Sequence, residues 1–408
     1  MAIGKLWTIA WRDLGRNRRR TLFSVIAVAL GLALLIMMDG FVAGIVQDSL
    51  DNTIRFETGH VQLRADSYDR TTSSLQWKDL LTDPEALAAQ AAAMPEVRAA
   101  APVLWASGVL NTRDESTGLQ IYGIDTTSAV YDPFRQALVA GDFLAPDDRS
   151  GILVGKRLAD SLGLGVGDRV NLAIVNANGQ PDDQAFTIRG LYTTGFFSYD
   201  DAAVLMPLSK AQAYTATDGH ASAVIIFLND ENNADAVAAA LRSPTVEALT
   251  YLKLNEVFLQ TMETATGFYV ILYGIVILVV AVIIANTLLM AVFERVREMG
   301  ILAALGMKGR QIALMFLVEA AIMGVFGAVL GIILGAASVA YLATAGMQIA
   351  DVGSMMQGVA IGTTVRATFN VSGMASLAIW TLIITLLAAL YPARYASRLE
   401  PVEALRAL

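Results

Sequence analysis

Four long apolar runs constrain this chain more than any other feature of its sequence. They extend from Thr21 to Met38, Phe268 to Val292, Ile312 to Leu342 and Val371 to Tyr391. Each reaches or approaches the roughly 20 residues that an α-helix needs to cross about 30 Å of hydrocarbon. Only 16% of the residues are charged, whereas soluble domains average about 25%. The sequence therefore predicts a membrane protein with four transmembrane helices.

The charged residues divide into two groups of opposite sign along the chain. Residues 39–263 contain 15 basic and 30 acidic residues, whereas the rest of the chain contains 14 basic and 7 acidic ones. Because basic loops stay on the cytoplasmic side of a membrane, both termini and the loop between the second and third runs are predicted to be cytoplasmic. The first run follows a long basic lead and has no clear cleavage site, which favours an uncleaved anchor over a signal peptide.

The long segment after the first run is large enough to fold around its own core, or around two smaller ones. Short β-branched or alternating stretches predict strands, and helical patterns lie between them. The predicted strands are Gly59–Arg64, Val103–Leu110, Gly118–Ile124, Arg169–Ile174, Ala185–Tyr192 and Ala223–Leu228. The predicted helices are Pro84–Ala93, Lys156–Leu162, Asn233–Arg242 and Val246–Thr266. This mixture predicts a large α+β extracytoplasmic domain inserted between transmembrane helices 1 and 2.

These patterns predict nine consecutive parts. They are a cytoplasmic amphipathic helix (1–20), transmembrane helix 1 (21–44), the extracytoplasmic α+β domain (45–266), transmembrane helix 2 (267–292), a cytoplasmic coupling loop (293–311), transmembrane helix 3 (312–343), an extracytoplasmic loop (344–370), transmembrane helix 4 (371–391) and a cytoplasmic tail (392–408).

The third run carries a packing signal on one of its faces. Gly327, Gly331 and Gly335 repeat every four residues, and small residues at this spacing let helix backbones approach closely in lipid. The few polar residues in the runs include Asn286 and Glu319. A carboxylate is costly in lipid unless it faces protein or water, so Glu319 either makes an interhelical hydrogen bond or has a role in coupling. The scarcity of polar groups disfavours a transport pore or a proton relay.

The sequence predicts no catalytic residues and no metal site. It contains no cysteine and only two histidines, His60 and His220, which are too few for a histidine-based metal centre. The glycine-rich run from Gly163 to Asp168 follows a predicted helix and precedes a predicted strand, the reverse of a dinucleotide-binding fingerprint; it predicts a turn. Gly151–Arg157 has one spacer too few for a phosphate-binding loop. The chain is therefore predicted not to be an enzyme.

Two segments of the chain resemble the FtsX/MacB-like ABC transporter permeases. The first, from Asn286 to Ala320, contains Glu-Arg-Val-Arg-Glu-Met-Gly, and the second, from Tyr391 to Arg406, begins Tyr-Pro-Ala-Arg. The stretch from Ile152 to Asp168 is similar to that family's periplasmic core domain. The resemblance implies a permease subunit in the bacterial inner (cytoplasmic) membrane. It also implies that no cofactor binds directly and that ATP and Mg²⁺ act through a separate ATPase subunit.

In this family the loop after transmembrane helix 2 is the coupling helix, which receives the motion of the ATPase. The loop has the composition of a short amphipathic helix, in which charge pairs would set the register on a partner and apolar residues would anchor it. The predicted coupling residues are Glu294, Arg297, Glu298, Met299, Gly300, Leu302, Leu305 and Gly306.

Within the family, the segment from Met38 to Leu63 most resembles the lipoprotein-releasing, LolC/LolE-type branch. Apolar side chains at the outer end of helix 1 predict either the wall of a lipid cavity or a dimer contact, and both interpretations stay open. They are Met37, Met38, Phe41, Val42, Ile45 and Val46.

The resemblance implies mechanotransmission, in which ATP-driven closure of the ATPase moves the outer domains. We expect extraction of lipoproteins or other lipidic cargo from the outer leaflet of the inner membrane. The alternatives are MacB-like export of peptides or antibiotics from the periplasm and non-transport regulation of a cell-wall hydrolase. The expected partners are an ABC ATPase, a second permease in a homodimer or heterodimer, membrane lipid and a periplasmic lipoprotein carrier, with no nucleic acid.

Overall fold

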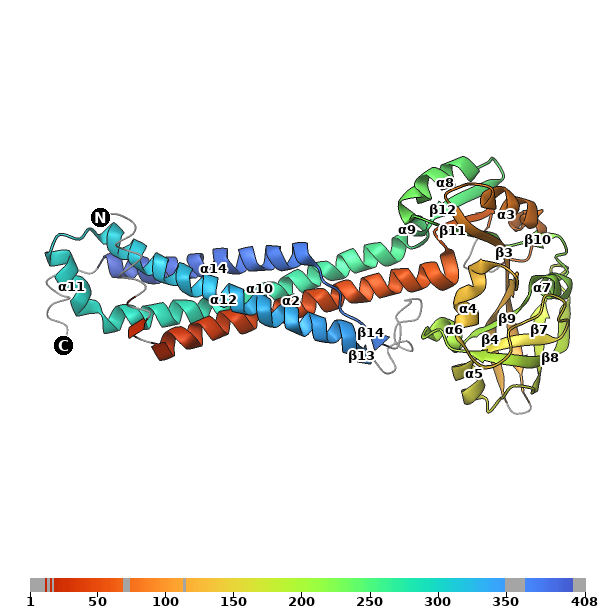
Figure 1. The fold of residues 1–408 in the computed structure, drawn as a ribbon, viewed down its shortest axis with the longest axis horizontal. Coiled ribbons are helices and arrows are strands. Elements are labelled where there is room, and N and C mark those ends of the chain that lie inside the picture. The colour runs from red at the N-terminus through yellow and green to blue at the C-terminus, as the bar shows by residue number, and fades with distance from the viewer. Residues whose placement is uncertain are drawn as a thin grey trace. The chain divides into compact units, whose positions relative to one another are not determined.

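The computed structural model describes residues 12, 15–16, 18–68, 74–112, 115–348 and 364–398. The chain forms two compact units, a helical bundle and an α+β domain (Figure 1). Residues 47–261 and 348–365 belong to the α+β domain, and the rest belong to the bundle. Most of the amphipathic helix predicted for residues 1–20 lies outside the described residues, as does most of the predicted tail.

The bundle contains four long helices, α2 (Arg18–Thr53), α10 (Glu256–Glu294), α12 (Gly309–Ala345) and α14 (Val371–Ser397). All four are long and apolar enough to cross a membrane, as the four apolar runs predicted. A short helix, α11 (Val296–Ala304), joins α10 to α12. Of the four long helices, α12 is the most buried within the structure and α10 the least.

All four helices extend beyond the spans predicted for them, and α2 and α10 do so by the largest margin. α2 continues past residue 44 to Thr53, and α10 begins at Glu256 rather than at residue 267. Polar side chains one turn apart support the extension of α2, because Gln47 donates a hydrogen bond to Asp51 and Asn52 donates one to Asp48. The apolar runs contain no information on these polar extensions, although the helix predicted over Val246–Thr266 covers the start of α10.

The α+β domain is built on a ten-stranded mixed sheet with the order β12-β1-β11-β3-β4-β9-β6-β8-β5, in which β7 pairs with β3 and β8. Its strands are β1 (Val61–Ala65), β3 (Val97–Asn111), β4 (Ser116–Ile124), β5 (Leu138–Gly141), β6 (Gly151–Gly155), β7 (Arg169–Val175), β8 (Pro181–Tyr192), β9 (Ala203–Pro207), β11 (Ala223–Leu228) and β12 (Val246–Thr250). Two further pairs are β2 (Leu81–Thr82) with β10 (His220–Ala221), and β13 (Met347–Gln348) with β14 (Thr364–Val365). The six strands predicted from the sequence are all present.

Helices and three buried clusters complete the domain. The helices are α3 (Pro84–Ala92), α4 (Asp132–Gln136), α5 (Lys156–Ser161), α6 (Phe197–Asp200), α7 (Leu208–Thr215), α8 (Ala234–Leu241), α9 (Tyr251–Leu254) and the π-helical turn η1 (Ile54–Thr58). One apolar cluster includes Leu104 and Phe186, a second includes Phe56 and Tyr199, and a third includes Leu63. The domain thus has three clusters where the sequence suggested one core or two.

The prediction of a continuous helix over Val246–Thr266 is wrong at its beginning. Val246–Thr250 forms β12, which pairs antiparallel with β1. Val246 and Ala248 alternate with less buried residues, which is the period-two pattern of a half-buried strand. This alternation is readable in the sequence, but the helical continuation from Glu256 masked it. Helix α10 begins only after the short helix α9.

The glycine-rich run between α5 and β7 is a turn, as predicted. Gly163 and Gly167 have φ values of +65° and +94°, a region that side chains with a Cβ rarely adopt. The Asp168 carboxylate accepts a hydrogen bond from the Gly165 backbone N–H at 2.7 Å. A hydrogen bond to the acidic residue of the same run, Asp168, therefore stabilises the turn.

Candidate functional site

The short helix α11 lies at the tip of the hairpin formed by α10 and α12 (Figure 1). α10 ends at Glu294, and α11 is closed by Gly306, whose φ of +94° suits glycine. At the start of the next helix, the Gln311 side chain accepts a hydrogen bond from the Lys308 backbone N–H at 3.0 Å, and the Gln311 backbone N–H donates one to the Lys308 carbonyl at 2.8 Å. α11 is thus a discrete helical segment bounded by a break on each side.

Two exposed ion pairs join this hairpin to the N-terminal end of the bundle. Arg20 donates to the Glu294 carboxylate at 2.6 Å, and Arg16 donates to Glu298 at 2.8 Å with both carboxylate oxygens in contact. The Arg16–Glu298 side chains are about half exposed, and pairs of this kind contribute only about 0–1 kcal/mol to stability. They nevertheless place the end of α10 and the beginning of α11 beside the beginning of α2.

A third ion pair is fully buried and joins α11 to α12. Arg295, in the break between α10 and α11, lies 3.7 Å from the Glu319 carboxylate, and the two side chains are 3% and 2% exposed. Removing one partner of a buried pair costs about 3–5 kcal/mol, because the other charge is left without compensation. The structure gives Glu319 an ion-pair partner, Arg295, whereas a role in coupling stays a prediction.

The depth of Glu319 follows from the packing of α12 against α2. The two helices run in the same direction, with Gly327 beside Val28 and Gly335 beside Ile36. Glu319 precedes Gly327 by eight residues and therefore lies level with Arg20, about 12 Å along the helix from that contact. The carboxylate is thus at the arginine-rich end of the bundle rather than in the middle of the apolar spans.

The predicted coupling residues divide into an exposed and a buried set. Leu305 is 80% exposed and Ile301 is 47% exposed. Arg297, Glu298 and Gly306 lie on the surface as well. Leu302 is half-buried.

Met299 and Gly300 are buried instead. Met299 is 2% exposed and packs in the apolar core that also contains Ile312 and Phe316. The prediction that Met299 anchors a partner is therefore wrong, because its side chain is buried in the core of the bundle. Ile301, which was not among the predicted coupling residues, is exposed near Leu305 on the surface of α11.

The glycines of α12 lie where α12 meets α2. A methyl group placed on Gly331 would lie 2.9 Å from the Ala29 carbonyl oxygen and 2.9 Å from the Leu32 Cβ. Comparable overlaps would occur at Gly327 with Val28 and at Gly335 with Ile36. The absence of a Cβ therefore allows the two helices to pack at close range.

The other predicted surface is the outer end of α2, where Met37, Met38, Phe41, Val42, Ile45 and Val46 are all half-buried. Two glycines on the same stretch, which sequence reasoning missed, are buried. Thr368 donates a backbone hydrogen bond to the Gly40 carbonyl at 3.0 Å, and a methyl group on Gly44 would overlap the Arg366 carbonyl. The Gly-x-x-x-Gly spacing of Gly40 and Gly44 in the sequence could have predicted this close approach of another backbone segment.

A polar contact lies beside these glycines. The Asn370 side-chain amide donates a hydrogen bond to the Asp39 carboxylate at 3.2 Å, and the Asn370 carbonyl oxygen caps α14 by accepting from the Gly373 backbone N–H. The chain before α14 is thereby fastened to the outer end of α2.

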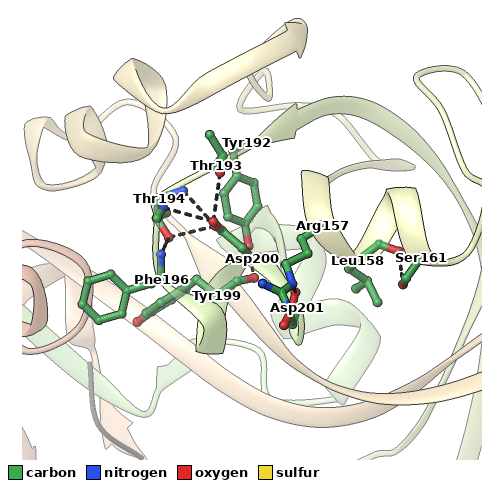
Figure 2. Close-up of polar contacts among 11 residues, drawn as sticks. Arg157, Leu158, Ser161, Tyr192, Thr193, Thr194, Phe196, Tyr199, Asp200 and Asp201 are labelled. Carbon is green, nitrogen blue, oxygen red and sulfur yellow. Dashed lines mark hydrogen bonds and ion pairs between the residues drawn. The ribbon is translucent and has the colours of Figure 1, made fainter. Parts of the chain in front are cut away.

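The α+β domain contains a dense polar cluster around Asp200, drawn in Figure 2. The buried Asp200 carboxylate accepts hydrogen bonds from the hydroxyls of Thr193 and Thr194 and from the backbone N–H groups of Thr194 and Gly195 (Figure 2). Beside it, Arg157 pairs with Asp201 at 2.8 Å; burial raises the pKa of Asp201 and Arg157 opposes that shift. Every acceptor contact of Asp200 serves the loop before α6, so this cluster shapes a loop rather than activating a nucleophile.

The described part of the chain has no cluster of three or more His, Asp or Glu side chains placed to hold a metal ion. His60 is a packing residue: its Nδ1 accepts a hydrogen bond from the Leu228 backbone N–H at 3.0 Å, and burial lowers its pKa.

Four membrane-compatible helices, an α+β domain between the first two and a charged helix between the second and third define an ABC transporter permease of the LolC/MacB type. A model of the MacB-like periplasmic core domain matches residues 21–243, and a model of the FtsX-like permease C-terminal region matches residues 270–401. Since the first match alone covers more than half of the 408 residues, the chain belongs to the family of permeases that carry a MacB-like periplasmic core domain.

Individual relatives come from two branches. The lipoprotein-releasing system transmembrane protein LolC of Neisseria meningitidis is 26% identical over 405 residues, which cover 95% of this chain and 94% of that protein. The macrolide export ATP-binding/permease protein MacB of Bordetella avium is 24% identical over 95% of this chain and 58% of its own length. The crystal structure of the periplasmic region of MacB from Actinobacillus actinomycetemcomitans matches 52% of this chain and 95% of that one, with 13% identity and a TM-score of 0.36.

Proposed function

We propose that this chain is the inner-membrane subunit of an ATP-driven machine in which a separate ABC ATPase docks on α11. The observation that carries this proposal is the combination of an exposed apolar surface, Ile301 and Leu305, with three ion pairs that connect the same hairpin to α2 and α12. An apolar anchor flanked by charges is what a helix needs to bind in a groove of a soluble partner. ATP and Mg²⁺ would then act in the ATPase.

The transmission of force follows from the same contacts. A displacement of α11 would pull on α2 through Arg16 and Arg20 and on α12 through Arg295. Both α2 and α10 continue without a break beyond their apolar segments, to Thr53 and from Glu256. Long uninterrupted helices transmit a tilt from one end to the other, so closure of an ATPase on the cytoplasmic side would move the domain between them. The termini, α11 and the ATPase would share that side.

We further propose that the cargo is lipidic, a lipoprotein or another molecule with acyl chains. Burying a methylene contributes about 0.8 kcal/mol, so exposing ~40 methylenes to water would cost roughly 30 kcal/mol. A permease must therefore offer an apolar surface before it releases such a cargo. The half-buried Met38, Phe41 and Ile45 at the outer end of α2 fit that need, and methionines adapt to chains of varied shape. The similarity to LolC along almost the whole chain supports this cargo.

Export of peptides or antibiotics is the second candidate, because the MacB relative also aligns with nearly all of this chain. The two functions differ in what touches α2: a lipidic cargo contacts its outer end, whereas a soluble peptide contacts only the α+β domain.

A second permease would complete the assembly, since one subunit presents a single α11 and ABC nucleotide sites form between two ATPases. A periplasmic carrier would receive the released lipoprotein.

The docking of the ATPase is tested by the variant Leu305→Asp. A carboxylate on the apolar anchor should abolish copurification of the ATPase and the stimulation of ATP turnover by the permease, because burying an unpaired charge is strongly penalised. The matched control is Val139→Asp, which places the same charge on a half-exposed apolar residue of β5 in the α+β domain. Full copurification with Leu305→Asp would contradict the assignment of α11.

A further inference from the structure

An apolar groove lies on the surface of the bundle between α2 and α12, near the arginine-rich end. It has a volume of about 350 Å³. Val25 and Met323 are buried and form its floor, whereas Leu22, Phe326 and Leu330 are 56%, 47% and 42% exposed and form its walls. The groove lies next to the close contact between the two helices. Gly327 of α12 packs directly beside Val28 of α2, and one turn earlier on α12 the larger Met323 lines the floor of the groove.

One end of this groove carries a positive charge. Arg18 lines the groove, and its Nε donates a hydrogen bond to the Gly15 carbonyl at 3.2 Å. The neighbouring Arg16 and Arg20 are neutralised by Glu298 and Glu294. Arg18 and Arg19, in contrast, form no ion pair with any carboxylate in the described part of the chain. The groove therefore has an apolar body along two membrane helices and, at its mouth, a guanidinium that pairs with no carboxylate among the described residues.

We propose that this groove binds an anionic phospholipid of the cytoplasmic leaflet. One acyl chain lies between Leu22 and Phe326, and the headgroup phosphate contacts Arg18. A guanidinium matches the oxygens of a phosphate with two parallel N–H donors, and basic residues beside a span attract anionic lipids. The leaflet rests on the proposed topology. The lipid is a resident component of the subunit, separate from the proposed cargo, which enters from the opposite leaflet.

The test uses the full-length chain in detergent, equilibrated with an equimolar mixture of phosphatidylglycerol and phosphatidylcholine, with retained lipid measured by native mass spectrometry. Wild-type protein should retain phosphatidylglycerol preferentially. Arg18→Gln should reduce that preference about fivefold, the effect of losing one direct guanidinium–phosphate contact whose net contribution is on the order of 1 kcal/mol. Arg19→Gln is the matched control: it removes the same charge one residue away, outside the groove, and should leave the preference nearly unchanged.

A second pair of variants tests the apolar part of the groove. Leu22→Trp fills the groove and should abolish retention of the tightly held lipid, whereas Phe23→Trp enlarges the adjacent side chain, which is 71% exposed and outside the groove, and should retain it. Equal effects of Arg18→Gln and Arg19→Gln would overturn the proposal by showing a diffuse charge effect. Undiminished retention in Leu22→Trp, or a photo-crosslinker at Leu22 that captures protein instead of lipid, would also overturn it. Neither result depends on ATPase docking or on cargo.

Discussion

The charged residues Glu294 and Glu298 of the α10–α12 hairpin pair with arginines at the other end of the sequence. The Arg16–Glu298 pair is about half exposed, so its contribution to folding stability is at most about 1 kcal/mol. Because its two members are separated by 282 residues in the chain, the pair nevertheless holds the start of the bundle to α11. Sequence analysis singled out Glu294 and Glu298 as coupling residues, but a separation of this length hides their arginine partners.

Charge exchange tests the Arg16–Glu298 pair. We expect Glu298→Arg to leave the unfolding free energy within about 1 kcal/mol of wild type while it uncouples ATP turnover from transport, because two arginines would repel each other. The double variant Arg16→Glu/Glu298→Arg restores the attraction and should restore coupling, measured as transport per ATP hydrolysed. If Glu298 instead bound the ATPase directly, the double variant would stay as uncoupled as the single one.

The buried Arg295–Glu319 pair should behave differently. Glu319→Ala leaves a guanidinium buried without its counter-charge and should lower the unfolding free energy by about 3–5 kcal/mol. Replacing both residues by apolar ones, as in Arg295→Met/Glu319→Leu, should recover most of that loss, since a buried pair and an apolar pair of similar volume are often equivalent. Thermal unfolding of the purified chain measures both. A double variant no more stable than Glu319→Ala would show that the pair is not the reason for the loss.

At the scale of elements, the sequence predicts the helices and strands that follow from the pattern of neighbouring residues. The apolar runs give the four spans, and the strand patterns give β1, β3, β4, β7, β8 and β11. Burial alone does not separate the strands that were predicted from those that were missed, because β1 and β11 are fully buried too. β1 alternates apolar and polar residues and β11 is rich in β-branched ones, whereas β6 and β9 are short apolar runs ending in Gly155 and Pro207, and such runs do not distinguish a strand from a buried helix. Met299 was assigned to the exposed surface because its burial depends on the packing of α12, which the local pattern does not contain.

The close packing of α12 on α2 predicts the effect of a larger side chain at one glycine. Gly331→Leu would overlap the Ala29 carbonyl and Leu32, so it should lower the stability of the subunit by roughly 1–3 kcal/mol, a typical cost of overpacking. Gly274→Leu in α10 is the control, because nothing lies within 4 Å of a methyl group placed there. Size-exclusion chromatography with thermal unfolding separates the outcomes. Conversion of Gly331→Leu to stable monomers would place this ridge at the interface between permeases instead.

At the scale of the whole molecule, the topology determines which side receives ATP. Since the chain contains no cysteine, a single introduced cysteine is the only thiol in it that a reagent can label. Asn178→Cys, in the exposed turn between β7 and β8, should react with an impermeant thiol reagent on intact spheroplasts. Ala304→Cys, exposed on α11, should react only after the membrane is opened. The reverse pattern would invert the orientation of the chain and exclude a cytoplasmic ATPase at α11.

The central claim is that ATP energy enters at α11 and acts on a lipidic cargo at the outer end of α2. It is tested most directly by a photo-crosslinker in place of Phe41 in the complete complex, with and without Leu305→Asp. In the wild-type background the crosslinker should capture an acylated protein or lipid before ATP is added, and ATP should remove that adduct. With Leu305→Asp the adduct should form and persist in ATP. Capture of only a soluble, unlipidated peptide, or equal loss of the adduct in both backgrounds, would contradict the account.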